Sequence, residues 1–241
     1  MGAMSDEWAA EGKERLPTIV RRFVEHNLPE GPLPTFTHVS QRGRMWKAAG
    51  SKPMLFTGVA EYQVRRVAFS WRAKFPLAGP LAWLSIVDAY DETGGRMDGR
   101  VWGLVPFMRS RGDEVKVGEV SRYVAELPWS PYSIVGNRDL EWREAGGRSI
   151  RVATSVGPRP IELTFGFDGE GDIASCFMAD RPRQVGKASV PTPWRGEFRD
   201  YAMFEGGVRI PRYGKVQWDL PEGTFVYWEG EMTGFSIAVR R

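Results

Sequence analysis

Residues 161–173, IELTFGFDGEGDI, have the pattern of two strands joined by a tight turn. The apolar residues Leu163, Phe165 and Phe167 occupy every second position, as on a strand with one buried face. The turn at 168–171, DGEG, is rich in residue types that tolerate the positive φ angles of a tight hairpin. This stretch therefore predicts an antiparallel β hairpin.

The same alternation of short apolar runs and turn clusters continues through most of the chain after residue 35. Val, Phe, Trp and Tyr dominate these runs, and 28 glycines and 17 prolines suit many short strands. The strand–helix alternation that builds a parallel sheet is not visible, so the predicted fold class is mainly β, or β-rich α+β, with antiparallel strands. The predicted strands are Leu55–Tyr62, Val64–Trp71, Leu81–Tyr90, Val101–Phe107, Ile150–Ser155, Ile161–Phe167, Ile173–Ala179, Phe225–Met232 and Phe235–Val239.

An amphipathic helix precedes the β region. Pro17 suits its first position, and residues 27–34, which are rich in proline, end it. Residues 5–15 are predicted to form a separate helical piece. We expect residues 1–34 to be a helical segment packed on a β domain of residues 35–241, in one structural domain. The side chains expected to be buried against the sheet are Leu16, Ile19, Val20 and Phe23.

A second, short helix is predicted over residues 119–127, where Pro128 stops it. Arg122 and Glu126 have i,i+4 spacing and share one face of this helix, beside Tyr123. Two interpretations are open. The pair locks the helix onto the sheet, or it belongs to a cavity in which Glu126 acts as an acid or base and Arg122 holds Glu126 or a substrate oxygen. The candidate catalytic residues are Glu126, Arg122 and Tyr123.

Composition limits the functions that the chain can have. It has 241 residues, of which 42% are hydrophobic and 26% charged, so it can bury a core. A net charge of +3 is too small to indicate a nucleic-acid partner. One cysteine and two separated histidines make a disulfide framework or a tight metal site unexpected. Without a stretch of 18 apolar residues or a signal peptide, we expect no membrane insertion and a cytoplasmic location.

The sequence motifs of cofactor sites and catalytic nucleophiles are either absent or lie next to the wrong secondary structure. Residues 169–174, GEGDIA, match the glycine-rich dinucleotide pattern, but a strand follows them where a helix N-terminus would be needed. The acidic residues of the same turn lack the twelve-residue calcium pattern. A Gly-x-Ser-x-Gly elbow and a phosphate loop are absent from the sequence. No cofactor is therefore expected.

Aromatic residues are unusually frequent, with ten tryptophans among thirty aromatics. They fill the core of a large sheet, or some of them line an apolar pocket, where rigid walls with polar edges suit a ligand. We expect at least one tryptophan to line such a pocket. The candidate substrate-binding residues are Trp129, Trp71, Tyr90, Trp142, Arg181, Trp194 and Trp218.

Residues 122–126, RYVAE, followed by 129–131, WSP, resemble the Arg-Tyr-x-x-Glu and Trp-x-Pro signature of a bacterial family of uncharacterised proteins. The resemblance covers roughly residues 36 to 240. Ser130 departs from it, because an aromatic residue is expected there, and the change would open space beside Trp129. Other segments that fit are 69–73, 88–90, 140–142, 181–182, 194–196, 207–211 and 216–218.

The closing pattern, Gly-x-x-Ile-Pro at 207–211 followed by a turn and two final strands, resembles the lipoprotein-carrier-like half-barrel. That fold implies one strongly curved antiparallel sheet that wraps around a helix and holds a hydrophobic ligand. A pigment-biosynthesis enzyme shares it, so the resemblance is compatible with catalysis as well as with carriage.

Three functions are compatible with the sequence. The main prediction is a cofactor-independent enzyme that encloses a hydrophobic small molecule and promotes its cyclisation, isomerisation or rearrangement, as in secondary metabolism. The alternative is a non-catalytic cytosolic binder or carrier of lipids or other apolar ligands. The third, a structural interaction protein, requires a large exposed apolar patch.

Overall fold

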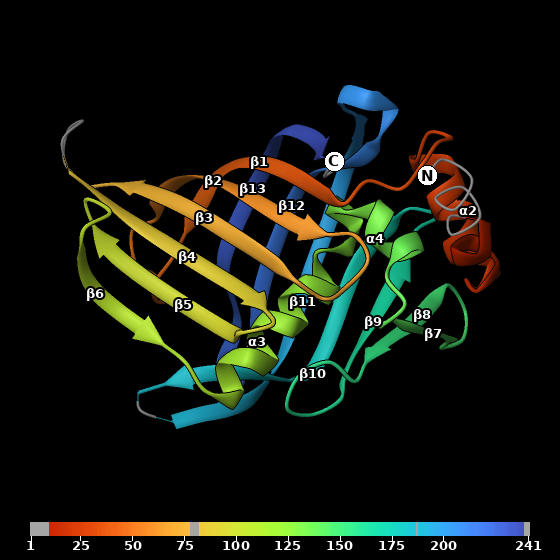
Figure 1. Ribbon diagram of the computed structural model, residues 1–241. Helices are drawn as coiled ribbons and strands as arrows, with labels where there is room; N and C mark the ends of the chain where they lie inside the picture. The colour runs from red at the N-terminus through yellow and green to blue at the C-terminus, as the bar shows by residue number, and fades with distance from the viewer. Residues whose placement is uncertain (1–9, 78–81, 187, 239–241) are drawn as a thin grey trace.

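The computed structural model describes residues 10–77, 82–186 and 188–238. These residues form one antiparallel sheet of thirteen strands in the order β6-β5-β4-β3-β2-β1-β13-β12-β11-β10-β9-β8-β7 (Figure 1). The single antiparallel sheet predicted from the sequence is confirmed. Its strands are β1 (Phe36–Met45), β2 (Met54–Gln63), β3 (Phe69–Pro76), β4 (Trp83–Asp91), β5 (Gly94–Val101), β6 (Val105–Ser110), β7 (Glu141–Glu144), β8 (Ser149–Thr154), β9 (Ile161–Phe167), β10 (Ile173–Val185), β11 (Ala188–Met203), β12 (Arg209–Leu220) and β13 (Gly223–Ala238).

Strand β1 joins the two halves of the sheet. Strands β1 to β6 follow one another as a meander, and so do β7 to β13. The two meanders meet where β1 pairs with β2 on one side and with β13 on the other, so that Phe36 faces both Gln63 and Ala238. The first and last strands of the chain therefore lie side by side in the middle of the sheet.

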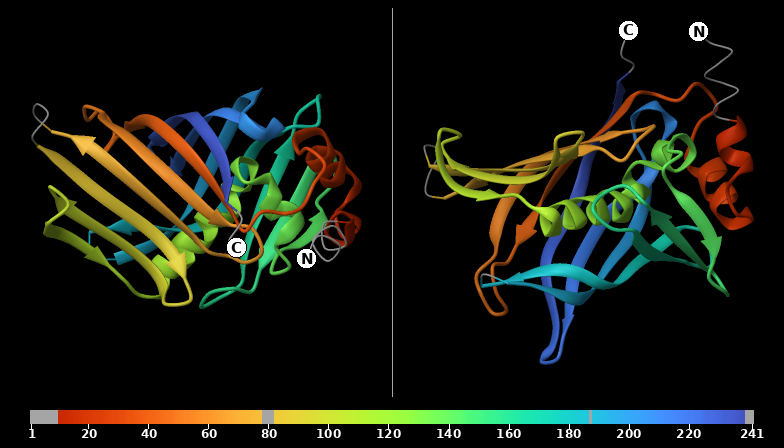
Figure 2. Two further views of the ribbon diagram at one scale, coloured as in Figure 1. Left: turned by 45° about the horizontal axis from the view of Figure 1, so that its top comes forward. Right: turned by 60° about the horizontal axis from the view of Figure 1, so that its bottom comes forward.

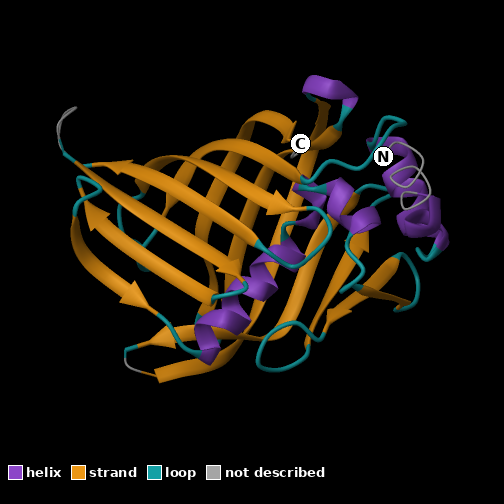
Figure 3. Cartoon of the chain, in the orientation of Figure 1, coloured by secondary structure: helices purple, strands orange, loops and turns teal. Residues whose placement is uncertain are grey.

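The sheet curves around helix α3 (Asp113–Ala125), which connects β6 to β7 (Figures 1 and 3). Contacts of α3 reach β4 and β5 on one side of the concave face and β9 and β10 on the other. The helix begins six residues before the predicted start at residue 119, with Asp113 and Glu114 in its first turn, where acidic side chains favour a helix N-terminus. Among the described residues, no helix is long and apolar enough to cross a membrane.

Close approach of α3 to the sheet depends on a glycine. A Cβ added to Gly95 would lie 2.7 Å from the Cα of Lys116, which is shorter than side chains tolerate. After α3, the 3-10 turn η1 (Leu127–Trp129) and the short helix α4 (Pro131–Gly136) continue over the concave face. A second 3-10 turn, η2 (Glu205–Gly207), separates β11 from β12.

The N-terminal helix α2 (Thr18–Asn27) packs against one end of the sheet, far from β6 (Figures 1 and 2). The ring of Phe23 meets Phe167 of β9 and Tyr201 of β11 edge-on, with centroids 6.1 Å apart in both pairs. Three of the four side chains expected to be buried, Leu16, Val20 and Phe23, are buried, and Ile19 is half-buried. Residues 10–14 are helical, as predicted for 5–15, whereas residues 5–9 of that piece lie outside the described residues.

The predicted hairpin at 161–173 is confirmed by the pairing of Phe167 with Ile173 across a turn in which Gly171 has a φ of 90°. The predicted strand Val101–Phe107 is wrong, because Trp102 (φ 53°) and Gly103 (φ 71°) form the turn between β5 and β6.

Other strand boundaries also differ from the predicted ones. The strand predicted at 64–71 begins only at Phe69, after a turn, and the two strands predicted near the C-terminus are the single strand β13. Leu81 and Val239, at the ends of two predicted strands, lie outside the described residues. The predicted strands do not include β1, β5, β7, β11 and β12. β5, GGRMDGRV, is too polar and too rich in glycine for its pattern to show.

Candidate functional site

Helix α3 brings charged side chains into the apolar concavity. Glu119, Arg122 and the residue that ends the helix, Glu126, are spaced i, i+3 and i+7 and therefore share one face. That face is turned toward the strands, since only 15% of the Arg122 side chain is exposed. Buried charges are costly unless they are paired and hydrogen-bonded, so their partners decide what the site can do.

Arg122 is held by two carboxylates. Its Nε donates to Oε1 of Glu126 over 2.8 Å, and its Nη1 donates to Oδ2 of Asp88, on β4, over 2.7 Å. Its guanidinium also lies 4.6 Å from the centre of the Trp71 ring. Burial alone would lower the pKa of Arg122, but the charges of Glu126 and Asp88 outweigh it and hold this pKa above its usual value.

Glu126 is fully engaged by these contacts. Its second oxygen, Oε2, accepts a 2.6 Å hydrogen bond from the hydroxyl of Tyr62, on β2. Burial, followed by the charge of Glu126 and this bond, raises the pKa of Tyr62 well above its usual value, so the tyrosine is the donor. Glu126 thus links α3 to the sheet through Arg122 and Tyr62. Its predicted role in proton transfer is untested.

Asp88 and Glu119 each keep a buried oxygen without a partner. These atoms are Oδ1 of Asp88 and Oε2 of Glu119, for which the described residues offer no hydrogen bond. Burial raises the pKa of Asp88 to about 6, with Arg122 opposing the rise and Glu126 adding to it. Burial and then the charge of Asp88 raise the pKa of Glu119 well above its usual value. Both effects favour the protonated form of Glu119.

Both carboxyl groups face a cavity of about 160 Å³ between α3 and the sheet. Its inner walls are the buried side chains of Trp71, Trp129, Trp194 and Trp228, whereas Met45, Met97, Val216 and Tyr227 at its rim are half-buried. The indole Nε1 of Trp228 is also buried without a partner among the described residues. The remaining lining residues are Asp88, Glu119, Arg122, Ala125, Glu126, Arg181 and Phe198.

Hydrogen bonds fix three of the indole walls. Nε1 of Trp71 donates to Oε1 of Gln41 over 3.1 Å, and Nε1 of Trp194 donates to the Tyr227 hydroxyl over 3.0 Å. Nε1 of Trp129 donates to a backbone carbonyl of β12, that of Pro211, over 3.0 Å. An indole whose N–H is bonded keeps its orientation, so the cavity is largely preformed.

A larger, open depression of about 870 Å³ lies beside β1, β2 and β13. Apart from Lys74, the charged side chains that line it pair with one another, Arg42 with Glu231 over 2.7 Å and Arg44 with Glu229 over 2.8 Å. Because these groups are exposed and already paired, the depression is a poorer candidate than the enclosed cavity.

Comparison with known proteins places the chain in a family. The sequence profile of a family of unknown function, DUF6544, matches residues 8–230, a range that includes every residue lining the cavity. The chain belongs to the DUF6544 family. The predicted resemblance to a family of uncharacterised proteins is thereby confirmed. No curated protein sequence matches the chain significantly.

The fold of this DUF6544 chain is similar to that of solved structures. A DUF1329 family protein from Desulfovibrio piger ATCC 29098 superposes with a TM-score of 0.53 at 8% identity, over 97% of this chain and 94% of that one. A LolA superfamily protein from Nitrosomonas europaea gives a TM-score of 0.45 at 10% identity, over 93% of each chain. At such identities the likeness concerns the fold alone, and the first of them supports the curved-sheet architecture.

Six of the ten residues predicted for the site line the cavity of the DUF6544 chain. They are Glu126, Arg122, Trp129, Trp71, Arg181 and Trp194. The guanidinium of Arg181, on β10, lies 4.4 Å from the centre of the Trp194 ring and 5.9 Å from that of Trp218. Trp218 stacks on Tyr227, with centroids 5.7 Å apart, and thus supports the rim without lining the cavity.

The other three predicted residues lie elsewhere. The hydroxyl of Tyr123 donates to the carbonyl of Gln63 and accepts from Nδ2 of Asn137, both over 2.9 Å. These bonds fasten α3 to the end of β2 and to the residue that follows α4. Trp142, on β7, stacks on Phe165 with centroids 6.3 Å apart. Tyr90 is half-buried beside a separate surface depression near the start of α3.

Ser130, the departure from the family signature, does not open the cavity. It is buried, and its Oγ is 2.6 Å from Oγ1 of Thr37 and 2.7 Å from Oγ of Ser133. The small residue forms a hydroxyl cluster that joins α4 to β1.

Sequence reasoning missed Asp88 and Glu119. Glu119 was detectable, because it lies three residues before Arg122 on the same helical face. Asp88 was not, because a single acid in an apolar strand shows nothing of what faces it. Described residues hold no cluster of three metal-ligating side chains.

Proposed function

We propose that this chain binds a small, mainly apolar molecule that carries a hydroxyl group, with the apolar part between the indole rings and the hydroxyl against Asp88. The observation that carries the proposal is the pair of unpartnered carboxyl oxygens, Oδ1 of Asp88 and Oε2 of Glu119, on two residues that line an aromatic cavity. Native proteins rarely leave buried polar atoms unbonded, and a ligand with a donor would satisfy the Asp88 oxygen.

The volume limits the size of the enclosed part. A cavity of roughly 150 Å³ is known to hold a benzene ring, and the cavity here measures about 160 Å³. One ring with a short substituent therefore fits. A longer apolar tail would leave past Met45 and Met97, the flexible half-buried side chains at the rim.

The charges favour a neutral ligand. The two arginines Arg122 and Arg181 balance the two carboxylates Asp88 and Glu126, and burial favours the neutral form of Glu119. A cation or an anion would upset this balance in a site with little water to screen it. A hydroxyl group supplies a donor for Asp88, and its oxygen accepts from the unbonded Nε1 of Trp228.

The matched probes for this proposal are benzyl alcohol and ethylbenzene. They have nearly the same size, and the hydroxyl group of benzyl alcohol takes the place of the terminal methyl group of ethylbenzene. Isothermal titration calorimetry is expected to show saturable binding of benzyl alcohol, tighter than that of ethylbenzene by about tenfold, since a hydrogen bond to a charged group contributes roughly 1.5–3 kcal/mol. Equal affinity for the two probes would contradict the role of Asp88.

An Ala125→Leu variant tests the location. Ala125 lines the cavity, so the larger side chain is expected to fill it, abolish binding and leave the melting temperature unchanged or higher. Ala153→Leu, on the half-buried face of β8, is the control and is expected to bind benzyl alcohol normally. Undiminished binding by Ala125→Leu would place the ligand elsewhere.

Catalysis is the second candidate, and one observation favours it. Burial raises the pKa of Asp88 to about 6 and also raises that of the nearby Glu119, and enclosed groups with shifted pKa values are typical of sites that move protons. Native mass spectrometry of the purified chain would identify a carried molecule. Chromatography after incubation with fresh copies of that molecule would then detect conversion. An unchanged molecule supports binding alone, and a cyclised or isomerised product supports the enzyme.

A further inference from the structure

An exposed apolar patch lies at the end of the β5–β6 hairpin. Trp102 is 51% exposed, Leu104 79%, Val105 55% and Phe107 51%, and Leu77 of the adjoining β3–β4 loop is 55% exposed. Single exposed apolar residues are ordinary, whereas a contiguous group of this kind marks an interaction site. These five residues are called the tip patch below.

Backbone hydrogen bonds hold residues of the tip patch in place. The amide of Trp102 donates to the carbonyl of Trp83 over 3.0 Å, and that of Leu77 donates to the carbonyl of Ala82 over 2.8 Å. The β5–β6 turn and the end of β3 therefore lie at the same corner of the sheet, at the edge opposite α2 (Figures 1 and 2).

A cationic surface flanks the tip patch. Met97 and Asp88 line the cavity, so the residues that alternate with them along β4 and β5 face away from it. On that outer face Lys74, Ser85 and Arg100 form one row across three strands, and Arg109 lies opposite Asp98 in the register of the next row.

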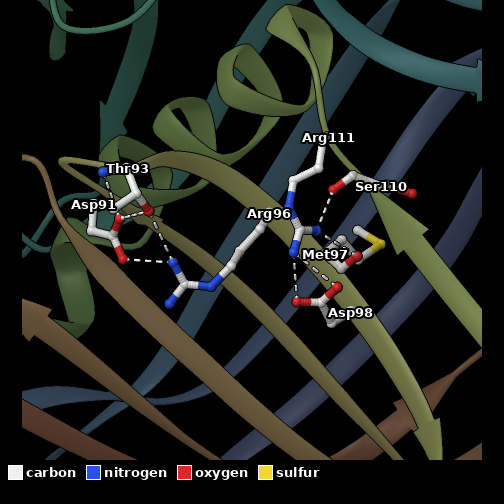
Figure 4. Close-up of polar contacts among 7 residues, drawn as sticks. All are labelled: Asp91, Thr93, Arg96, Met97, Asp98, Ser110 and Arg111. Atoms are coloured by element: carbon white, nitrogen blue, oxygen red, sulfur yellow. Dashed lines mark hydrogen bonds and ion pairs between the residues drawn. The ribbon is translucent and has the colours of Figure 1, made fainter. Parts of the chain in front are cut away.

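Acids near this surface are already engaged. Nη2 of Arg111 lies 3.0 and 2.9 Å from the two carboxylate oxygens of Asp98, and Nη1 of Arg96 donates to Oδ2 of Asp91 over 2.6 Å (Figure 4). Lys74, Arg100 and Arg109 thus have no ion-pair partner among the described residues, and their charges are available to an external partner.

We propose that the tip patch docks on an anionic lipid bilayer. Trp102, Leu104 and Phe107 would enter the headgroup boundary, where aromatic and aliphatic side chains are stabilised, and Arg100, Arg109 and Lys74 would lie against the phosphates. A second copy of the chain fits less well, because symmetric pairing of two tip patches would bring the cationic flanks together.

The strand register connects the tip patch to the cavity. From the hairpin inward, Val101 is opposite Leu84, Gly99 is opposite Ile86, and Met97 is opposite Asp88. Phe107 covers Gly99, since an added Cβ there would lie 2.6 Å from its ring. A row of apolar side chains thus runs about 13 Å along β5, from the bilayer side to the cavity rim. This is a route by which an apolar molecule would pass between membrane and cavity, a step that rests on the proposed function.

Flotation of the full chain with lipid vesicles tests the docking. We expect binding to phosphatidylcholine vesicles containing about one quarter phosphatidylglycerol, weak binding to pure phosphatidylcholine, and loss of binding as salt rises from about 0.1 M to about 0.5 M. Equal binding to both vesicle types, or no binding to either, would overturn the proposal.

Matched variants locate the surface. Leu104→Ser is expected to weaken vesicle binding about tenfold, and Arg100→Gln about fivefold. Met203→Ser and Arg212→Gln, exposed residues on the other half of the sheet, are the controls and are expected to bind like the wild type. Equal losses in variants and controls would contradict the location. A change of oligomeric state in Leu104→Ser, measured by light scattering, would instead indicate a second copy.

Two variants distinguish an error in the membrane-docking proposal from an error in the proposed ligand binding. Leu104→Ser is expected to keep its affinity for benzyl alcohol, and Ala125→Leu is expected to keep its affinity for vesicles. If one of these variants lost both benzyl alcohol binding and vesicle binding while circular dichroism showed it folded, the assignment of two distinct sites would be wrong.

Discussion

The guanidinium of Arg122 lies 4.6 Å from the centre of the Trp71 ring, and Trp71 is itself fixed by Gln41. Two carboxylates, Asp88 and Glu126, complete the surroundings of this cation. Arg122 thus fastens α3 to strands β3 and β4 by hydrogen bonds, charge and aromatic contact at once. The cavity exists because the helix is held at this position over the sheet.

An Arg122→Lys variant is expected to be less stable by about 2 kcal/mol. A lysine keeps the charge, but it cannot donate to Glu126 and Asp88 with the fixed fork of a guanidinium. Urea denaturation measures the loss. Arg42→Lys is the control, because Arg42 pairs with Glu231 but is 65% exposed, and it is expected to change stability by less than about 0.5 kcal/mol. Similar losses in both variants would show that burial of Arg122 does not matter.

The pH dependence of stability reports the burial of Asp88. Its pKa is about 6 in the folded chain, against 3.8 as the ordinary value, so between these values the folded state binds more protons than the unfolded state. Its contribution to stability is therefore greatest at low pH and falls as the pH rises through this window, by about 3 kcal/mol in all. Asp88→Asn removes this contribution.

The measurement is the difference in unfolding free energy between the wild type and Asp88→Asn at several values from about pH 4 to about pH 7. The wild type is expected to lose stability relative to the variant as the pH rises. A difference that grows in favour of the wild type would mean that Arg122 dominates over burial and that the pKa of Asp88 is lowered.

Gly214 tests how tightly the cavity wall is packed. A Cβ at this position on β12 would lie 2.3 Å from Cζ2 of Trp129, so Gly214→Ala must displace the indole. We expect a loss of about 1–3 kcal/mol in stability and weaker binding of benzyl alcohol. Gly234→Ala, whose Cβ would lie at an ordinary 3.5 Å from Cβ of Ser40, is expected to be close to neutral. Equal tolerance of the two changes would contradict a rigid Trp129.

The sequence predicted the fold better than the site, for a physical reason. The hairpin at 161–173 and the helix at Leu16–Phe23 follow from local periodicity and turn chemistry, which a single segment contains. The β1–β13 pairing joins residues as far apart in the sequence as Phe36 and Ala238, and no local pattern encodes it.

The candidate site depends on such distant pairings. Arg122 and Glu126 were found because helical spacing places them together, and Trp129 because it follows them directly. Asp88 reaches Arg122 only through the curvature of the sheet, which brings β4 over the last turns of α3. Tyr123 was predicted to join Glu126, but its hydroxyl points to Gln63 and Asn137 instead.

The same substitution at two glutamates of α3 should have opposite effects. Glu119 is 5% exposed, carries an unpartnered oxygen and has a pKa raised by burial and by the charge of Asp88. Burial disfavours the charged form of this carboxyl group, and a neutral amide avoids that cost. Glu119→Gln is therefore expected to have unchanged or higher stability.

Glu126→Gln should be destabilising by about 3 kcal/mol, because it removes one of the two charges that face the buried Arg122 and leaves a single acceptor oxygen for two donors, Arg122 and Tyr62. Urea denaturation of both variants near neutral pH gives the comparison, and benzyl alcohol titration of each gives the effect on the site. Glu119→Gln with normal stability but altered affinity would assign Glu119 to the ligand. If Glu126→Gln instead melted like the wild type and lost only ligand binding, Glu126 would belong to the binding site itself, and its role in holding α3 to the sheet would be wrong.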